Sequence, residues 1–99
     1  MMVRYRNRAQ ADIDGIYDSI AERNTDRAQR VENAIRAAGE LLGREPELGV
    51  ATGHSEARRW PMPKYNYAAF YRIDWDEDVI DILRVIDGRR VRDLKGVPR

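Results

Sequence analysis

Arginine and aromatic side chains dominate the chemistry available in the C-terminal part of this sequence. The set consists of Arg58, Arg59, Trp60, Lys64, Tyr65, Tyr67, Tyr71, Arg72, Arg84, Arg89, Arg90 and Arg92. Guanidinium groups donate paired hydrogen bonds to phosphate and carboxylate groups. Arginines grouped beside a small sheet therefore predict a surface that binds an anionic partner.

Two nucleic-acid interpretations of this set can be weighed against simple packing. A metal-free ribonuclease needs a general base and a general acid beside cations that stabilise its charged transition state. The cations are abundant, but no convincing base or acid accompanies them. The aromatic rings could stack on RNA bases, yet the alternating positions of Tyr65, Tyr67 and Tyr71 favour packing in the core or on a sheet face.

Metal and nucleophilic chemistry have little support in the sequence. His54 is the only histidine and cysteine is absent, which excludes disulfides and thiolate catalysis. The acidic turn at residues 76–78 lacks the glycine and the distal glutamate of a calcium loop, and no glycine-rich phosphate loop is present. We therefore expect neither a metal nor a cofactor, and we interpret His54 as an ordinary loop residue.

Composition predicts one globular domain over residues 1–99. Hydrophobic residues make up 42% and charged residues 35% of the 99 positions. The net charge of +1 argues against strong direct binding of DNA by the chain alone. Neither a leader segment nor a membrane-spanning apolar stretch is visible, so we expect a cytoplasmic protein without membrane association.

Apolar residues that recur at spacings of three and four predict two helices. The first stripe predicts a helix over residues 8–22 with Asn7 as its cap. The second predicts a helix from an Asn24 cap to about Leu42, because Gly43 suits the position that follows a helix. Two amphipathic helices joined by a short break form an antiparallel helical hairpin with one apolar side.

The remaining segments predict a small sheet. Strands are expected at residues 3–5, 57–60, 65–74 and 79–86, with a loop at 44–55 and an acidic turn at 75–78. The element order is therefore β-α-α-β-β-β. We predict an α+β fold in which the helical hairpin packs on one face of a mainly antiparallel sheet, with the first strand added at an edge.

The last predicted strand is apolar on nearly both faces. A strand of this kind is typical of the centre of a sheet, where both faces are covered. Asp81 and Arg84 interrupt the apolar pattern of residues 79–86, and each should be tied to a partner.

With these elements in place, the sequence resembles the ParE/RelE superfamily, the toxins of bacterial type II toxin–antitoxin pairs. Residues 9–16 are similar to the family pattern Ala-x-x-Asp-Leu-x-x-Ile, and residues 46–49 are similar to its Pro-x-x-Gly. Arg58-Arg59 precedes the meander, as in many members. Residues 70–73 and 82–90 resemble the aromatic-Tyr-Arg-Val and Ile-Leu-Arg-Val-x-x-Gly-x-Arg strands. The resemblance covers nearly the whole chain.

Members similar to RelE cleave messenger RNA in the ribosome, and this chain departs from them. They use basic residues on the sheet and commonly a tyrosine or histidine near the C-terminus. Here Ala68 stands at a basic position, and residues 91–99 contain neither tyrosine nor histidine. As a nuclease of this type, the chain would use Arg90, Arg84 and Lys64.

Members similar to ParE resemble this chain in the Ile-Leu-Arg-Val strand and in an Arg-x-x-Arg-Asp-Leu ending at residues 89–94. A departure is Asp87, where many such members have histidine. This resemblance implies a growth-inhibiting toxin of the bacterial cytoplasm that inhibits DNA gyrase by direct contact, without catalysis. A third interpretation is a binding-only member that is not toxic.

The resemblance also implies a cognate ParD-like antitoxin. Its tail would follow an apolar groove between the helical hairpin and the sheet, with carboxylates meeting arginines. The residues expected to bind the antitoxin or the target are Arg58, Arg59, Arg72, Arg84, Arg89, Arg90 and Arg92.

Overall fold

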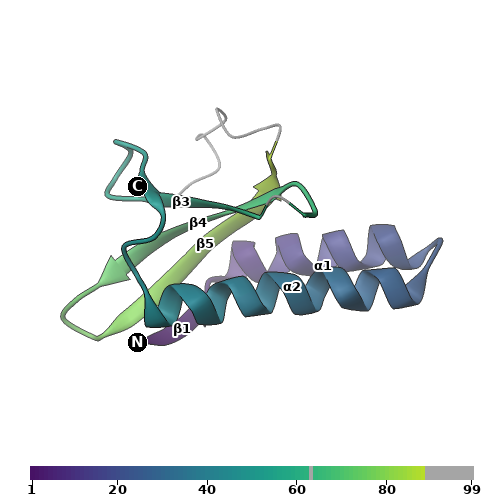
Figure 1. Cartoon of the computed structure of the whole chain (residues 1–99), viewed down its shortest axis with the longest axis horizontal. Coiled ribbons are helices and arrows are strands. Elements are labelled where there is room, and N and C mark those ends of the chain that lie inside the picture. Colours follow the sequence, from purple (N-terminus) through teal and green to yellow (C-terminus); the bar gives the residue numbers. More distant parts are fainter. Residues whose placement is uncertain (63, 89–99) are drawn as a thin grey trace.

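The computed structural model describes residues 1–62 and 64–88 and contains two helices and a mixed sheet (Figure 1). The elements are β1 (Met2–Tyr5), α1 (Asn7–Ala21), α2 (Thr25–Arg44), β2 (Val50–Ala51), β3 (Arg58–Met62), β4 (Tyr67–Asp74) and β5 (Val79–Asp87). The predicted α+β fold and its element order are confirmed. The short strand β2 is an addition, inside the segment predicted as a loop.

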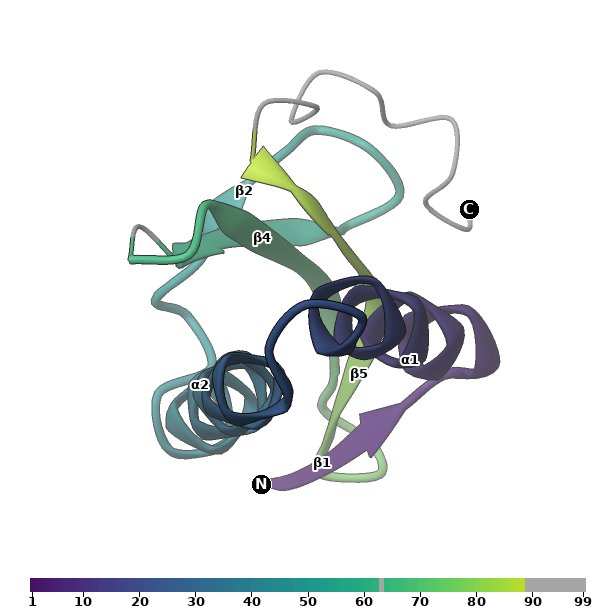
Figure 2. The ribbon, with the colours of Figure 1, turned by 90° about the vertical axis from the view of Figure 1, so that its right-hand side faces the viewer.

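The five strands form one sheet in the order β1-β5-β4-β3-β2. Strand β1 runs parallel to β5, and the other neighbours are antiparallel. Both helices lie side by side on one face of the sheet, as the end-on view shows (Figure 2). The predicted central place of the last strand is confirmed, because β5 lies between β1 and β4.

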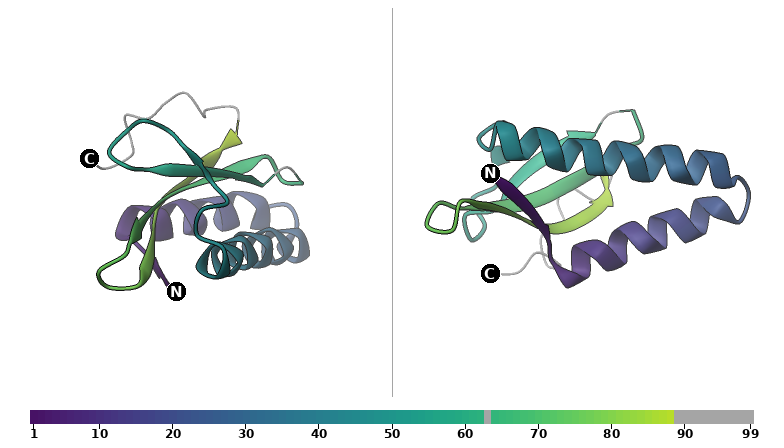
Figure 3. Two further views of the ribbon diagram at one scale, coloured as in Figure 1. Left: turned by 60° about the vertical axis from the view of Figure 1, so that its left-hand side comes forward. Right: turned by 90° about the horizontal axis from the view of Figure 1, so that it is seen from below.

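The helical hairpin is longer than the sheet that it covers. Its turn projects beyond the end of the sheet in the side view and in the view from below (Figures 1 and 3). The side chain of Asn24 caps α2 by accepting a hydrogen bond of 2.9 Å from the N–H of Arg27, as predicted.

The predicted cap of the first helix is wrong. Asn7 is already the first residue of α1, and the N-cap residue Arg6 makes no side-chain cap bond. The N–H of Arg6 donates to the carbonyl of Ile82 at 3.0 Å, which is a bond of the sheet. Because the sheet bonding extends to the residue beside the helix, no separate capping residue fits between β1 and α1.

The predicted end of the second helix is also wrong, since α2 continues through Gly43 to Arg44. A Cβ at Gly43 would lie 2.8 Å from the carbonyl oxygen of Met1 and 3.0 Å from a methyl of Val3. The amino group of Met1 donates to the carbonyl of Gly43 at 2.8 Å. Glycine here permits close approach of the chain start to α2, rather than a left-handed turn.

The main core lies between the helices and the sheet. It contains Ala9, Ile13, Val31, Ile35, Leu42, Met62, Ala69, Tyr71, Ile80, Ile82 and Val85. Tyr71 is fully buried, while Tyr65 and Tyr67 are partly buried and pack against this core. The prediction that these tyrosines pack in the core is therefore confirmed.

A smaller cluster, Ala57, Ala68, Phe70 and Leu83, is buried on the outer face of the sheet, away from the helices. A β-bulge interrupts the register there, because Phe70 pairs with Arg84 whereas Tyr71 pairs with Ile82. Side chains of a strand alternate between its faces, and the extra residue shifts this alternation so that Ile82 and Val85 both face the main core. The strand is apolar on nearly both sides because an apolar cluster covers each face.

Two helical glycines give opposite predictions for stability. Gly15 has no atom within 4 Å of a built Cβ, so Gly15→Ala should raise the free energy of unfolding by about 0.5–1 kcal/mol through helix propensity. Gly43→Ala gains the same propensity but meets the Met1 carbonyl, and it should lower that free energy by about 1–3 kcal/mol. Urea unfolding of both variants measures the difference, and equal effects would contradict the close packing at Gly43.

Candidate functional site

The guanidinium of Arg84 is held by Asp12 of α1. Its Nε and Nη2 atoms donate to the two carboxylate oxygens at 2.7 and 3.0 Å, and the backbone N–H of Val85 donates to the same carboxylate at 2.9 Å. The side chains of Arg84 and Asp12 are only 16% and 18% exposed. The expected partner of Arg84 is therefore present, and it is part of the scaffold.

Asp81, a second polar residue of β5, is bound by Arg4 of β1. Arg4 donates from Nε and Nη2 at 2.6 and 3.0 Å, and a second arginine, Arg6, lies 3.7 Å away. The hydrogen bonds from Arg4 hold the pKa of the Asp81 carboxyl below its usual value. The expectation that Asp81 has a partner is confirmed.

Arg58 fastens the loop that follows α2. Its Nη1 donates to the carbonyls of Gly49 and Glu47 at 2.7 and 3.3 Å. The hydroxyl of Tyr71 donates to the carbonyl of Pro46 at 2.6 Å and accepts from the N–H of Gly49 at 2.8 Å. The Pro-x-x-Gly segment is thus held from two sides by side chains of β3 and β4.

Arg59 and Arg72 belong to the outer face of the sheet. Arg59 follows Arg58 along β3 and therefore points to the opposite face, where it pairs in register with Phe70. Among the described residues, its Nε is the one buried side-chain nitrogen or oxygen without a hydrogen-bond partner. The Nε of Arg72 donates to the carbonyl of Ser55 at 2.9 Å.

The arginines predicted as one surface are therefore distributed over different sides of the described fold. Arg58 faces the loop after α2, Arg84 faces α1, and Arg59 and Arg72 lie on the outer face. Lys64 is exposed in the turn before β4, with its Nζ 5.4 Å from the ring centre of Tyr65. Arg89, Arg90 and Arg92 lie outside the described residues.

Sequence reasoning missed a cavity that we call the arginine pocket. It has a volume of about 270 Å³ and is lined by Arg4, Arg6, Arg8, Arg72, Asp81 and Leu83. The sequence does contain a signal for this pocket, because Arg4 and Arg6 alternate with the core-facing Val3 and Tyr5. An alternating pattern places the arginines on the opposite face of the strand.

A second cavity, which we call the α1 groove, has a volume of about 370 Å³ and runs between α1 and the end of β5. It is lined by Ala11, Asp12, Gly15, Ile16, Ser19, Tyr67, Arg84, Val85, Ile86 and Asp87. This groove lies between the helical hairpin and the sheet, where the sequence predicts an apolar groove, but Asp12, Arg84 and Asp87 make its lining partly charged. The residues that α1 contributes to it include the small Ala11, Gly15 and Ser19.

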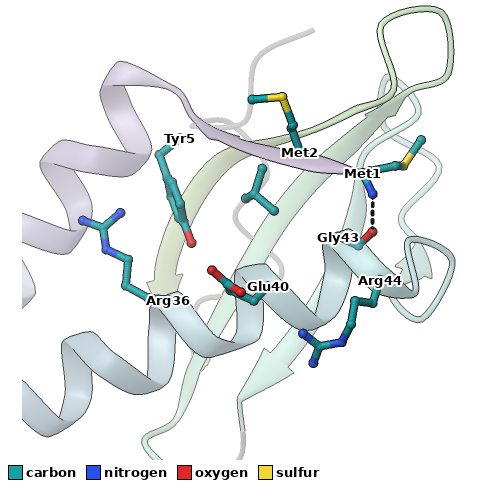
Figure 4. A pocket seen from close by; sticks show the side chains of 8 residues that line it. Met1, Met2, Tyr5, Arg36, Glu40, Gly43 and Arg44 are labelled. Atoms are coloured by element: carbon teal, nitrogen blue, oxygen red, sulfur yellow. Dashed lines mark hydrogen bonds between the residues drawn. The ribbon is translucent and has the colours of Figure 1, made fainter.

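A third cavity, of about 570 Å³, lies between β1 and α2 (Figure 4). The guanidinium of Arg36 stands 4.6 Å from the ring centre of Tyr5, and burial raises the pKa of the Tyr5 hydroxyl. The hydrogen bond from Met1 to Gly43 closes one end of this cavity. The contact of Arg36 with Tyr5 and the hydrogen bond of Met1 to Gly43 therefore join β1 to α2.

Neither a metal-binding cluster nor a membrane-spanning helix occurs among the described residues. Across residues 1–62 and 64–88, no group of three or more histidine or acidic side chains could hold a metal ion. In the part of the chain that the structure describes, neither helix combines the length and the apolar character needed to span a bilayer.

The family model described as the ParE toxin of the type II toxin–antitoxin system parDE matches residues 3–92. The chain therefore belongs to the ParE toxin family. This confirms the predicted membership of the ParE/RelE superfamily. A comparison with curated proteins found no match.

Solved structures of toxin–antitoxin systems share the fold. A chromosomal ParDE system from P. aeruginosa is 21% identical, with a TM-score of 0.75 over 88% of this chain and 95% of that one. The RelBE2 complex of Mycobacterium tuberculosis is 22% identical, with a TM-score of 0.68 over 87% and 95%. The RelBE complex of E. coli is 12% identical, with a TM-score of 0.58 over 87% and 94%.

Removal of the Asp12 carboxylate should destabilise the fold. Asp12→Ala leaves the Arg84 guanidinium and the Val85 N–H without their acceptor, and it should lower the free energy of unfolding by about 2–4 kcal/mol. Asp12→Asn keeps one oxygen acceptor and should lower the free energy of unfolding by a smaller amount. The control Asp18→Ala, at an exposed position of α1, should stay within about 0.5 kcal/mol in the same urea titration. Equal stabilities of all three variants would refute the role of Asp12.

Acid should remove the stabilisation that Asp81 provides. The pKa of Asp81 lies below 3.8 in the folded chain, so its ionised form stabilises the fold above that value. This contribution is lost as the pH falls from about 4 toward the lowered pKa. Asp81→Asn should therefore be less stable than the wild type at neutral pH, and the difference should shrink in acid. A difference independent of pH in urea unfolding would contradict this, and Asp76→Asn in the exposed turn is the control.

Proposed function

We propose that the chain is a toxin that inhibits DNA gyrase by direct binding and is neutralised by a cognate ParD-like antitoxin. The observation that carries this proposal is the match of residues 3–92 to the ParE toxin family. The alternative activity, ribosome-dependent cleavage of messenger RNA, is expected of RelE-like members instead.

The surroundings of two polar side chains of the sheet support inhibition by contact. The guanidinium of Arg84, one of the three residues expected in a nuclease, is occupied by Asp12 and largely buried. The hydroxyl of Tyr71 makes hydrogen bonds to Pro46 and Gly49, and burial raises its pKa. A general acid or base must reach the substrate proton, and both side chains are engaged by the fold.

The antitoxin would occupy the α1 groove. An amphipathic segment can place apolar side chains against Ile16 and Ile86, while Gly15 allows its backbone to approach α1 closely. The ParDE and RelBE neighbours are themselves toxin–antitoxin systems.

The target would meet the outer face of the sheet. Arg59 offers a guanidinium whose buried Nε has no partner among the described residues, and Arg72 lies on the same face. Arg89, Arg90 and Arg92, expected from the sequence to join this surface, lie outside the described residues. Charged side chains on a target-facing surface fix register and orientation more than they add affinity.

A supercoiling assay with purified gyrase and the purified full-length chain tests the proposal. We expect loss of negative supercoiling or accumulation of cleaved DNA, and recovery of activity when the antitoxin is added. Arg59→Glu should abolish the inhibition because it reverses a target-facing charge. Arg30→Glu, which makes the same charge change on the exposed side of α2, should inhibit like the wild type.

Two outcomes would overturn the proposal. Full gyrase activity together with messenger cleavage at the ribosomal A site would identify a RelE-like ribonuclease. Full gyrase activity together with healthy growth on expression without the antitoxin would identify a binding-only member.

A further inference from the structure

A fourth cavity, which we call the Trp75 groove, gathers apolar surface that the fold leaves exposed. It has a volume of about 460 Å³ and lies between the segment that leads into β3 and the end of β4. Trp75 is 62% exposed, and Val50, next along the chain to a lining residue, is 66% exposed. Exposed apolar side chains beside a groove mark interaction sites, and tryptophan is enriched where proteins bind each other. The lining residues are Glu47, Ala51, Gly53, Glu56, Ala57, Arg58, Ile73 and Trp75.

The sheet leaves an open edge beside this groove. Strand β3 begins at Arg58, which pairs with Tyr71, so residues 72–74 of β4 lie beyond the start of β3. Among the described strands, the neighbour of these residues is β5 alone. An extended peptide can bind a sheet edge through its main chain, while the side chains beside the edge supply specificity. The groove therefore suits an extended segment of chain.

The charged side chains around the groove are mainly acidic. Glu47 and Glu56 line it, and Asp76 follows Trp75 in the acidic turn. These three acidic residues are exposed, and in the described part of the chain their carboxylates form neither an ion pair nor a hydrogen bond. The lining cation Arg58 instead donates to two backbone carbonyls of the loop after α2. Carboxylates are thus available beside an exposed indole.

We propose that the Trp75 groove binds an extended, arginine-containing segment of a partner protein. A guanidinium group stacks on an indole face by a cation–π contact, and nearby carboxylates accept its hydrogen bonds. Trp75 supplies the indole, and Glu47 and Glu56 of the same lining supply the carboxylates. An acidic peptide or a nucleic acid would bring like charges together there. The inference goes beyond the proposed function, since it requires neither gyrase inhibition nor an antitoxin.

A peptide titration followed by NMR shifts of amide and indole N–H groups tests this surface on the purified full-length chain. The probe is a capped hexapeptide that alternates arginine with valine, and its control alternates glutamate with valine. At constant ionic strength, the arginine peptide should produce saturable shifts of the Trp75 indole and of residues 51–58, whereas the glutamate peptide should produce none. The indole of Trp60 packs against the main core and should shift little.

Variants separate the contribution of the indole from that of the carboxylates. Trp75→Ala and Glu47→Gln/Glu56→Gln should each weaken binding about fivefold or more, because they remove the cation–π contact and the charge-assisted hydrogen bonds. Asp18→Asn/Glu22→Gln removes the same charge from exposed positions of the helical hairpin and should bind like the wild type. A lysine–valine peptide should bind more weakly than the arginine peptide, because an ammonium group has no planar face to stack.

Several outcomes would overturn the inference. These are shifts that do not saturate, an equal response to the glutamate peptide, and full binding by either groove variant. Shifts of the Trp75 indole that follow protein concentration without any peptide would assign the groove to a second copy of the chain instead. If a variant fails to fold, the wild-type footprint decides alone, and shifts centred away from Trp75 and residues 51–58 then reject the proposal.

Discussion

The rest of the structure depends on the carboxylate of Asp12, because strand β1 ends before β5 does and leaves a backbone donor of β5 without a strand partner. Strand β1 pairs with β5 only up to Ile82, so the next backbone donor on that side, the N–H of Val85, has no strand to bind. An unpaired backbone donor at the buried Val85 would cost as much as a lost hydrogen bond. Asp12 accepts that N–H and both donors of Arg84, and it thereby fixes α1 against the central strand and shapes the α1 groove.

Strand β5 contributes to two different faces of the sheet. On the helix side, Ile82 and Val85 join the core, while Leu83 joins the apolar cluster of the outer face. The same outer face carries Asp81 and, across β4, Arg72, which border the arginine pocket. Ordinary alternation along the strand supplies both faces, and the extra residue places Val85 on the core side with Ile82.

The sequence was sufficient to predict the fold because apolar periodicity is a local signal. This periodicity and the residues at its ends identified both helices, the Asn24 cap and the central strand. The sequence was insufficient where residues far apart along the chain determine the local structure. The prediction of Asn7 as a helix cap was wrong because the N–H of Arg6 makes a sheet bond. The predicted helix end at Gly43 was wrong because this glycine packs in space against the start of the chain. The arginines of the site were only partly predicted for the same reason. Arg84 and Arg4 find their carboxylates 72 and 77 positions away, which no local pattern reveals.

The motifs that carry the family resemblance turn out to be motifs of the scaffold. Asp12 closes the sheet, the Pro46–Gly49 segment is fastened by Arg58 and Tyr71, and Arg84 completes the contact with α1. Residues engaged in this way preserve the fold whatever partner is bound, because their donors and acceptors are satisfied internally. Specificity for a partner must then reside in charges outside these motifs.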